Sequence, residues 1–255
     1  MRVLIASLFL MPLIFKRGEF HIVRRHWREF FWVGIFTTAI PFTLLSYVSL
    51  SMTAGYTSLL NATVPMFSAI IAWFWLKQTL TWVGIIGLVL GFAGVFVLAS
   101  HGSADYGEIL LPITAAVLAT SGYAYGSCYS SLHLHKFPSI TAAAGSQMYA
   151  AIFMLPFGLW FWPDHTPSAL SWLCALALGV FSTAIALIMF YHLLKQVGVA
   201  KTVSVTYLIP AFGILWGILF LDESLTGNML IGGALILADV GVTTSASAKK
   251  GVRLS

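Results

Sequence analysis

The stretch KTVSVTYLIPAFGILWGILFLDESLT, residues 201–226, decides the fold, because it is a long apolar run with a proline near its middle and two adjacent acids near its end. A second stretch, YTSLLNATVPMFSAIIAWFWLKQTLT at residues 56–81, has its proline at the matching place and ends in the same Leu-Thr. Each run is long enough to cross a hydrocarbon layer of about 30 Å. The two stretches predict a pair of related membrane-spanning helices, each kinked at its proline.

The composition of the whole chain is that of a membrane protein. Of its 255 residues, 59% are hydrophobic and 8% are charged, whereas a soluble domain is about a quarter charged. We therefore expect an all-α membrane protein with nine transmembrane helices, over residues 2–15, 30–52, 55–76, 82–99, 108–131, 139–161, 170–193, 199–221 and 226–245. The first range is short, but no small-residue cleavage site follows it, so it is not interpreted as a secretory signal.

We attribute the net charge of +5 to Lys and Arg residues in the loops on one side of the membrane rather than to nucleic-acid binding. If the helices simply alternate, all cations but Arg2 fall on one face: Lys16, Arg17, Arg24, Arg25, Arg28, Lys77, Lys136, Lys195, Lys201, Lys249, Lys250 and Arg253. The opposite loops carry acids, among them Asp222 and Glu223. The positive-inside rule then predicts a cytoplasmic C-terminal tail over residues 246–255. The acid pair is expected to cap the turn on the outer side.

The chain repeats itself when it is shifted by 145 residues. GIFTTAI at 34–40 falls on GVFSTAI at 179–185 with five of seven positions identical, and without a gap Pro65 falls on Pro210. One supersecondary unit has been duplicated. We expect a first repeat over residues 1–100, with four of its five helices and the first absent, and a second over 101–245 with all five. Because five is odd, the repeats insert in opposite orientations, the inverted architecture of secondary transporters.

Both proline-bearing stretches, each continued through its glycine-bearing last helix, resemble the EamA module of the drug/metabolite transporter (DMT) superfamily. In that family a mid-helix proline precedes a Gly-Glu-x-Leu-Thr type turn. Here the turn acid is kept as Glu223 but replaced by Gln78, and the late glycine stands at Gly94 but is replaced by Asp239. The resemblance implies a ten-helix fold that lacks its first helix here, in the bacterial inner membrane. It also implies a function as an exporter of amino acids or other metabolites.

Polar side chains recur on one face of each proline-bearing helix. Thr57, Asn61 and Pro65 are spaced four residues apart, and Thr202, Thr206 and Pro210 repeat the pattern. Proline frees a backbone carbonyl, which is tolerated where the helix faces protein or a water-filled cavity. We expect these faces to line a central substrate cavity with hinges at the prolines. The alternative is that the hydroxyl groups join neighbouring helices.

Other side chains inside the predicted spans are weaker candidates for cavity lining or gating: Tyr123, Gln147, His192, Tyr207 and Trp216. Polar groups within a bilayer are costly unless they are paired, so each is a functional hypothesis. Trp216 is also explained by packing, and His192 by proximity to the cytoplasmic interface. Asp239 is an acid inside a predicted span and is a candidate for proton coupling, although it too could reach water.

The leading functional hypothesis is a gradient-driven carrier of a small organic solute that exports by alternating access. No phosphate-binding loop for ATP is present. An intramembrane enzyme is the alternative, but no HExxH or GxSxG motif occurs, so no catalytic residue, cofactor or metal ligand is expected. A non-transporting scaffold or truncated fragment is a further alternative.

Glycines 84, 87, 91 and 94 form a close-packing face for another helix of this chain or of a second protomer in a homodimer.

Overall fold

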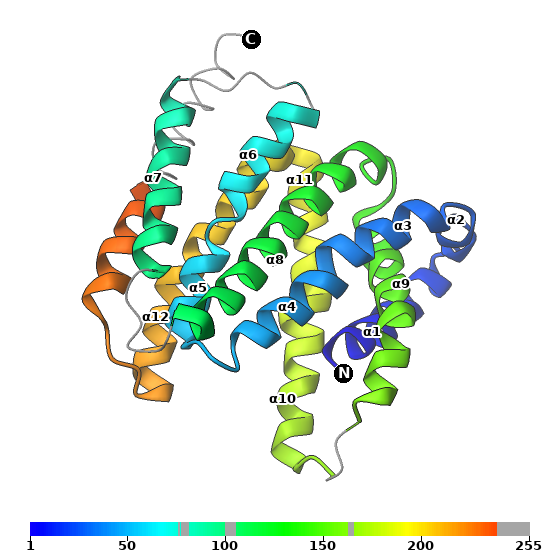
Figure 1. The fold of residues 1–255 in the computed structure, drawn as a ribbon. Coiled ribbons are helices and arrows are strands. Elements are labelled where there is room, and N and C mark those ends of the chain that lie inside the picture. The colour runs from blue at the N-terminus through cyan, green and yellow to red at the C-terminus, as the bar shows by residue number, and fades with distance from the viewer. Residues whose placement is uncertain (76, 78–81, 100–105, 163–165, 239–255) are drawn as a thin grey trace. The chain divides into compact units, whose positions relative to one another are not determined.

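The computed structural model describes residues 1–255 except 76, 78–81, 100–105, 163–165 and 239–255. Every element in this described part is a helix, which confirms the all-α class (Figure 1). Five of the described helices are long and apolar enough to cross a membrane: Trp27–Val48, Ala54–Trp75, Ser139–Trp160, Ala169–Val199 and Lys201–Leu221. Trp82–Leu98 and Gly227–Ala238 are shorter apolar helices.

The chain divides into two compact units, each built from two segments of sequence. Unit 1 comprises Met1–Ile40 and Tyr129–Gly198, and unit 2 comprises Pro41–Cys128 and Val199–Ser255. The helices of unit 1 are α1 (Arg2–Lys16), α2 (Phe20–Arg25), α3 (Trp27–Gly34), the π-helix η1 (Ile35–Ala39), α9 (Ser139–Trp160), α10 (Ala169–Gly179), the π-helix η2 (Val180–Ile185) and α11 (Ala186–Val203) as far as Gly198. At Gly198 the backbone leaves helical geometry with φ of 78°.

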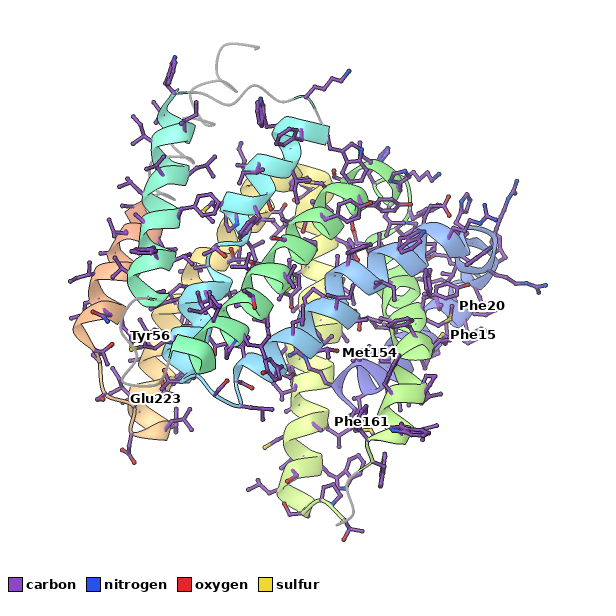
Figure 2. All side chains as sticks on the ribbon, viewed as in Figure 1. Phe15, Phe20, Tyr56, Met154, Phe161 and Glu223 are labelled. Atoms are coloured by element: carbon purple, nitrogen blue, oxygen red, sulfur yellow. The ribbon has the colours of Figure 1, made fainter. Side chains whose placement is uncertain are left out.

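In unit 1, α9 contacts both α1 and the α3–η1 segment. Leu10 and Ile14 of α1 and Phe30 of α3 are fully buried, so the apolar faces of these helices form the core. Gly34 permits the closest approach, because a Cβ there would collide with the carbonyl oxygen of Ser146 in α9. Phe15 at the end of α1 stacks on Phe20 at the start of α2, with ring centroids 4.8 Å apart (Figure 2).

The two π-helices fall on the two copies of the repeated heptapeptide. η1 begins at Ile35 and η2 begins at Val180, which is its equivalent after the shift of 145 residues. A π-helix closes i→i+5 hydrogen bonds in place of i→i+4, which widens the turn, and such turns occur frequently at functional sites. Threonine hydroxyls bond the widened turns: Thr37 Oγ1 donates to the Val33 carbonyl at 2.6 Å, and Thr183 Oγ1 donates to the Leu178 carbonyl at 2.9 Å.

Unit 2 holds both proline-bearing segments. Its helices are α4 (Ile40–Val48), α5 (Ala54–Asn61), α6 (Val64–Trp75), α7 (Trp82–Ala99), α8 (Tyr106–His133) as far as Cys128, the 3₁₀-helix η3 (Ser204–Tyr207), α12 (Leu208–Leu221) and the helix Gly227–Ala238. α5 packs along α12, as Figure 1 also shows, and α6 contacts η3. Leu59 and Leu60 of α5, Leu98 of α7 and Ile236 belong to one buried apolar cluster.

Each proline follows a break in its helix rather than kinking a continuous one. α5 ends at Asn61 and α6 begins at Val64, so Pro65 lies in the first turn of α6. In the second copy, η3 interrupts the helix over Ser204–Tyr207, and Pro210 lies in the first turn of α12. First-turn backbone N–H groups have no partner within a helix, so a proline costs least there. The predicted kink at each proline is therefore corrected: the irregularity lies about one turn before the ring, and the proline occupies the first turn of the helix that follows.

Candidate functional site

The predicted polar stripe of the first repeat lies on α5 of unit 2. Thr57 Oγ1 and Asn61 Oδ1 are one helical turn apart, and both atoms are buried without a hydrogen-bond partner in the described part of the chain. Ser68 Oγ on α6, seven residues after Asn61, is also buried without a hydrogen-bond partner in the described part of the chain. Leaving a polar group buried and unpaired costs about 1–3 kcal/mol. The stripe therefore presents three oxygen atoms that a polar ligand or water would stabilise.

Other hydroxyl groups of the same two helical segments are satisfied locally. Ser58 Oγ donates to the Gly55 carbonyl, and Thr63 Oγ1 donates to the Leu60 carbonyl, each at 2.7 Å. Bonds of this kind are the usual solution for serine and threonine in an apolar helix. The stripe atoms are thus distinguished from their neighbours by lacking such bonds.

The equivalent stripe of the second repeat is paired differently. Thr206 Oγ1 donates to the Val203 carbonyl at 2.7 Å. Thr202 and Pro210 are buried, as Pro65 is in the first copy. The side chain of Tyr207, a predicted cavity residue, lies outside the part of the chain that the structure describes. The two stripes share spacing and burial, but only the first carries hydrogen-bonding oxygens without partners among the described residues.

The remaining predicted residues of unit 2 lie on two other helices. Tyr123 of α8 is half-buried and meets Phe42 edge to face, with ring centroids 6.2 Å apart. Trp216 of α12 lies in an exposed aromatic row between Phe212 and Phe220, at centroid distances of 6.5 and 5.3 Å. Since α5 packs along α12, the stripe and this helix are neighbours within the unit.

Two predicted residues belong to unit 1. Gln147 of α9 is fully buried, and its Nε2 donates to Thr38 Oγ1 of η1 at 2.8 Å. His192 of α11 has an exposed side chain. The predicted site residues are therefore divided between the two units, and Asp239, the proton-coupling candidate, lies outside the described residues together with Gln78. No group of three or more His, Cys, Asp or Glu side chains within the described ranges could hold a metal ion.

Glu223 has a structural role that its position in the sequence does not reveal. Its carboxylate accepts hydrogen bonds from the backbone N–H groups of Ala54, at 2.6 Å to Oε1, and Gly55, at 3.0 Å to Oε2. Figure 2 labels Glu223 close to Tyr56, at this end of α5. The expected cap is thus present, but it serves the start of α5, in the other repeat, rather than its own turn.

Sequence reasoning also missed Arg2, the cation that departs from the one-sided charge pattern. Its Nε donates to Thr183 Oγ1 of η2 at 2.7 Å. Under the shift of 145 residues Arg2 falls on Gln147, and Thr38 falls on Thr183. The two side-chain hydrogen bonds onto the π-helices are therefore equivalent positions of the repeat. Extending the alignment to residue 2 would have found this pair.

Comparison with known proteins places these features in a family. The chain matches the EamA-like transporter family over residues 1–100 and 110–245. A solved crystal structure with no stated function has the same fold, with a TM-score of 0.71 and 20% identity, covering 96% of this chain and 84% of that one.

Similar proteins are named as transporters rather than enzymes. The uncharacterized transporter YvbV of Bacillus subtilis is 30% identical over 203 residues, which are 77% of this chain but only 65% of the relative's length. The uncharacterized transporter YoaV of the same bacterium is 24% identical over 96% of this chain and 85% of its own. A probable terminal-alkyne amino-acid exporter of Streptantibioticus cattleyicolor is 25% identical over 77% of this chain and 66% of its own. This multi-pass membrane protein belongs to the EamA-like transporter family.

Proposed function

We propose that the protein is a secondary transporter that exports a small organic metabolite, an amino acid or a related compound, across the bacterial inner membrane by alternating access. The observation that carries this proposal is the row of unpaired buried oxygens on Thr57, Asn61 and Ser68. A helix in lipid tolerates such atoms where they line a cavity that a polar solute or water enters. The name of the S. cattleyicolor relative supports an amino-acid-like solute.

The alternating-access mechanism is supported by the paired irregularities of the backbone. Residues 1–100 and 101–245 are proposed to be repeats of opposite orientation, and each contributes one π-helix and one break before a proline. Such positions change backbone angles with less loss of hydrogen bonding than a regular helix. They are suitable hinges for opening the cavity alternately to the two sides. The coupling ion would enter the same cycle, with Asp239 as the proposed proton carrier.

Transport by the purified protein in proteoliposomes tests this function. Counterflow of a radiolabelled panel of amino acids and related metabolites should be saturable with wild-type protein. Asn61→Leu removes an unpaired acceptor and Thr206→Val removes a hydroxyl from the second stripe, so each should lower the rate at least about 10-fold, equivalent to about 1.4 kcal/mol. The control is Thr114→Val, because that exposed hydroxyl bonds only the Leu111 carbonyl of its own helix.

The outcomes separate the parts of the proposal. If the wild-type protein gives no counterflow with any compound of the panel, the proposed class of solute is wrong. If the wild-type protein transports and both stripe variants retain normal flux with normal insertion, the stripe is not part of the site.

A further inference from the structure

A network of buried polar side chains in unit 1 comprises two hydrogen-bonded pairs, Gln147 with Thr38 and Tyr191 with Ser146, which are connected through the neighbouring positions 146 and 147 of α9. Ser146 accepts a hydrogen bond from the Tyr191 hydroxyl at 3.1 Å. Ser146, Gln147 and Thr38 are each 0% exposed, and Tyr191 is 2% exposed. Buried polar networks of this kind are stable only when their members are satisfied.

One atom of the network is not satisfied. Gln147 Nε2 is bonded to Thr38, but Gln147 Oε1 is buried without a partner in the described part of the chain. With Nε2 donating to Thr38, the amide atom left unpaired is Oε1, which can only accept a hydrogen bond. The equivalent position in the first repeat holds Arg2, which donates to Thr183 in the same way but has no acceptor atom. Gln147 therefore makes the same kind of bond to a π-helix as Arg2 does, and unlike Arg2 it also has an acceptor atom without a partner among the described residues.

Close packing of the α3–η1 segment on α9 fixes the position of this acceptor. The Gly34 backbone contacts the Ser146 carbonyl, which holds the α3–η1 segment directly against α9. Thr38 is held in η1, where the backbone departs from α-helical geometry. π-helical turns occur frequently at functional sites, since they orient side chains that a regular helix would turn away. An acceptor on α9 that is held against such a turn is suited to recognising a single donor group.

We propose that Gln147 is a solute-contacting residue of unit 1, whose Oε1 accepts a hydrogen bond from the ammonium group of the transported compound while Nε2 remains bonded to Thr38. This assignment rests on the carrier function proposed above and specifies its substrate class, compounds with a free amino group. Solvent does not reach Gln147 in the conformation described here. The donor group therefore meets Oε1 when the helices around it separate during transport.

The competing explanation is that the network only holds η1 against α9. The internal repeat supplies a matched control, because Thr183→Val removes the equivalent bond from η2 without affecting an unused acceptor. The test variants are Gln147→Met, which keeps the length of the side chain without polar atoms, and Gln147→Glu, which keeps an acceptor. Gln196→Met is a second control, since Gln196 is an exposed glutamine of α11.

The experiment measures counterflow and its competition by pairs of compounds that differ in the amino group: L-leucine with 4-methylpentanoate, and L-threonine with 3-hydroxybutanoate. Wild-type protein should prefer the amino member of a pair at least about 10-fold. Gln147→Met should raise the KM for that member by a similar factor and abolish the preference, and Gln147→Glu should restore it. Gln196→Met should keep the wild-type KM, and Thr183→Val should change it less than Gln147→Met does. Melting temperatures in detergent report the structural contribution of each variant.

The proposal is overturned if Gln147→Met retains the wild-type KM and preference, whether or not its melting temperature falls. It is also overturned if Thr183→Val changes the KM as strongly as Gln147→Met, since the bonds would then have a shared structural role. Absence of wild-type counterflow would instead count against the carrier function itself.

Discussion

Glu223 completes the capping of a helix that begins 169 residues earlier in the sequence. The first four N–H groups of a helix have no partner within it. In α5, Glu223 accepts from Ala54 and Gly55, and the Thr53 hydroxyl accepts from Tyr56 at 3.3 Å. The regular helical bonds begin with Thr57, whose N–H donates to the Thr53 carbonyl at 3.0 Å. The negative carboxylate also lies at the positive end of the helix dipole. One side chain thus joins the turn after α12 to the start of α5.

Replacing this carboxylate should destabilise the protein measurably. Glu223→Ala is expected to lower the free energy of unfolding by about 0.5–2 kcal/mol, the usual cost of losing a helix cap. Glu223→Gln should cost less, since its amide oxygen still accepts a bond. Unfolding in detergent with increasing denaturant measures the difference. The control is Asp222→Asn, because Asp222 is exposed and asparagine tolerates its positive φ of 50°.

Gly217 provides a second way to displace the same carboxylate. A Cβ at this position would lie 2.5 Å from Glu223 Oε2. Gly217→Ala should therefore reproduce much of the loss seen in Glu223→Ala, and the double variant should lose less than the sum of the two. Additive losses would show that the two residues act independently, which contradicts the geometry.

Between whole helices, glycine sets the approach of α7 and the helix Gly227–Ala238. A Cβ on Gly94 would lie 2.7 Å from the Gly232 carbonyl oxygen, and one on Gly232 would lie 2.9 Å from the Gly94 carbonyl oxygen. The backbones are therefore in direct contact at this crossing. Where neither helix faces water, such contact between small residues supplies much of the association energy.

Filling this contact should separate the two helices. Gly94→Leu is expected to lower the free energy of unfolding by about 1–3 kcal/mol, because the larger side chain cannot be accommodated without moving the backbone. Gly158→Leu in α9 is the control, since a Cβ there meets nothing within 4 Å. The same unfolding titration compares them. Leucine is a better helix former than glycine, so propensity alone would stabilise both variants, and a Gly94→Leu protein as stable as Gly158→Leu would contradict the contact.

The positions of the long helices were largely predictable, because lipid-spanning segments need continuous apolar sequence. The predicted range 139–161 corresponds to Ser139–Trp160, and 82–99 to Trp82–Ala99. Residues 30–52 were predicted as a helix that runs from Trp27 to Val48 instead. The helix begins earlier than predicted because polar residues such as Arg28 still belong to its first turn. It ends earlier than predicted because the chain turns at Ser49–Thr53.

The π-helices and the distant partners were not predictable. A helix that is apolar all round has no hydrophobic period, so one extra residue in a turn leaves no trace in the sequence pattern. Thr57 and Asn61 could be selected as a stripe, since their spacing is local. The carboxylate of Glu223 could not be assigned to α5, because that bond depends on how two repeats pack within unit 2.

At the level of the whole molecule, charge predicts how the protein lies across the membrane. The cations of residues 16–25 precede Trp27–Val48, and Arg28 lies in its first turn. The side chains of these cations are exposed, whereas Asp222 lies on a turn predicted to face outward. Retaining positive charge on the cytoplasmic side is the strongest known determinant of orientation. This charge bias predicts which side of the membrane each loop faces, whereas the predicted opposite orientation of the repeats depends on their odd number of helices.

Cysteine labelling in intact cells tests that orientation. In a Cys128→Ala, Cys174→Ala background, Ser224→Cys should react with a membrane-impermeant maleimide from outside. Arg25→Cys should react only after the membrane is permeabilised. Both original side chains are exposed, so accessibility within the protein does not limit the reaction. The reverse pattern would contradict the predicted topology.

The long sequence separation between Glu223 and α5 has a consequence for biosynthesis. At about 5–20 residues per second, the ribosome needs roughly 8–34 s to extend the nascent chain from Ala54 to Glu223. Until Glu223 is made, α5 lacks the carboxylate that bonds its first two amide groups in the folded protein. A nascent chain released before codon 223 never gains this cap, so completion of α5 is a late step of assembly in the translocon.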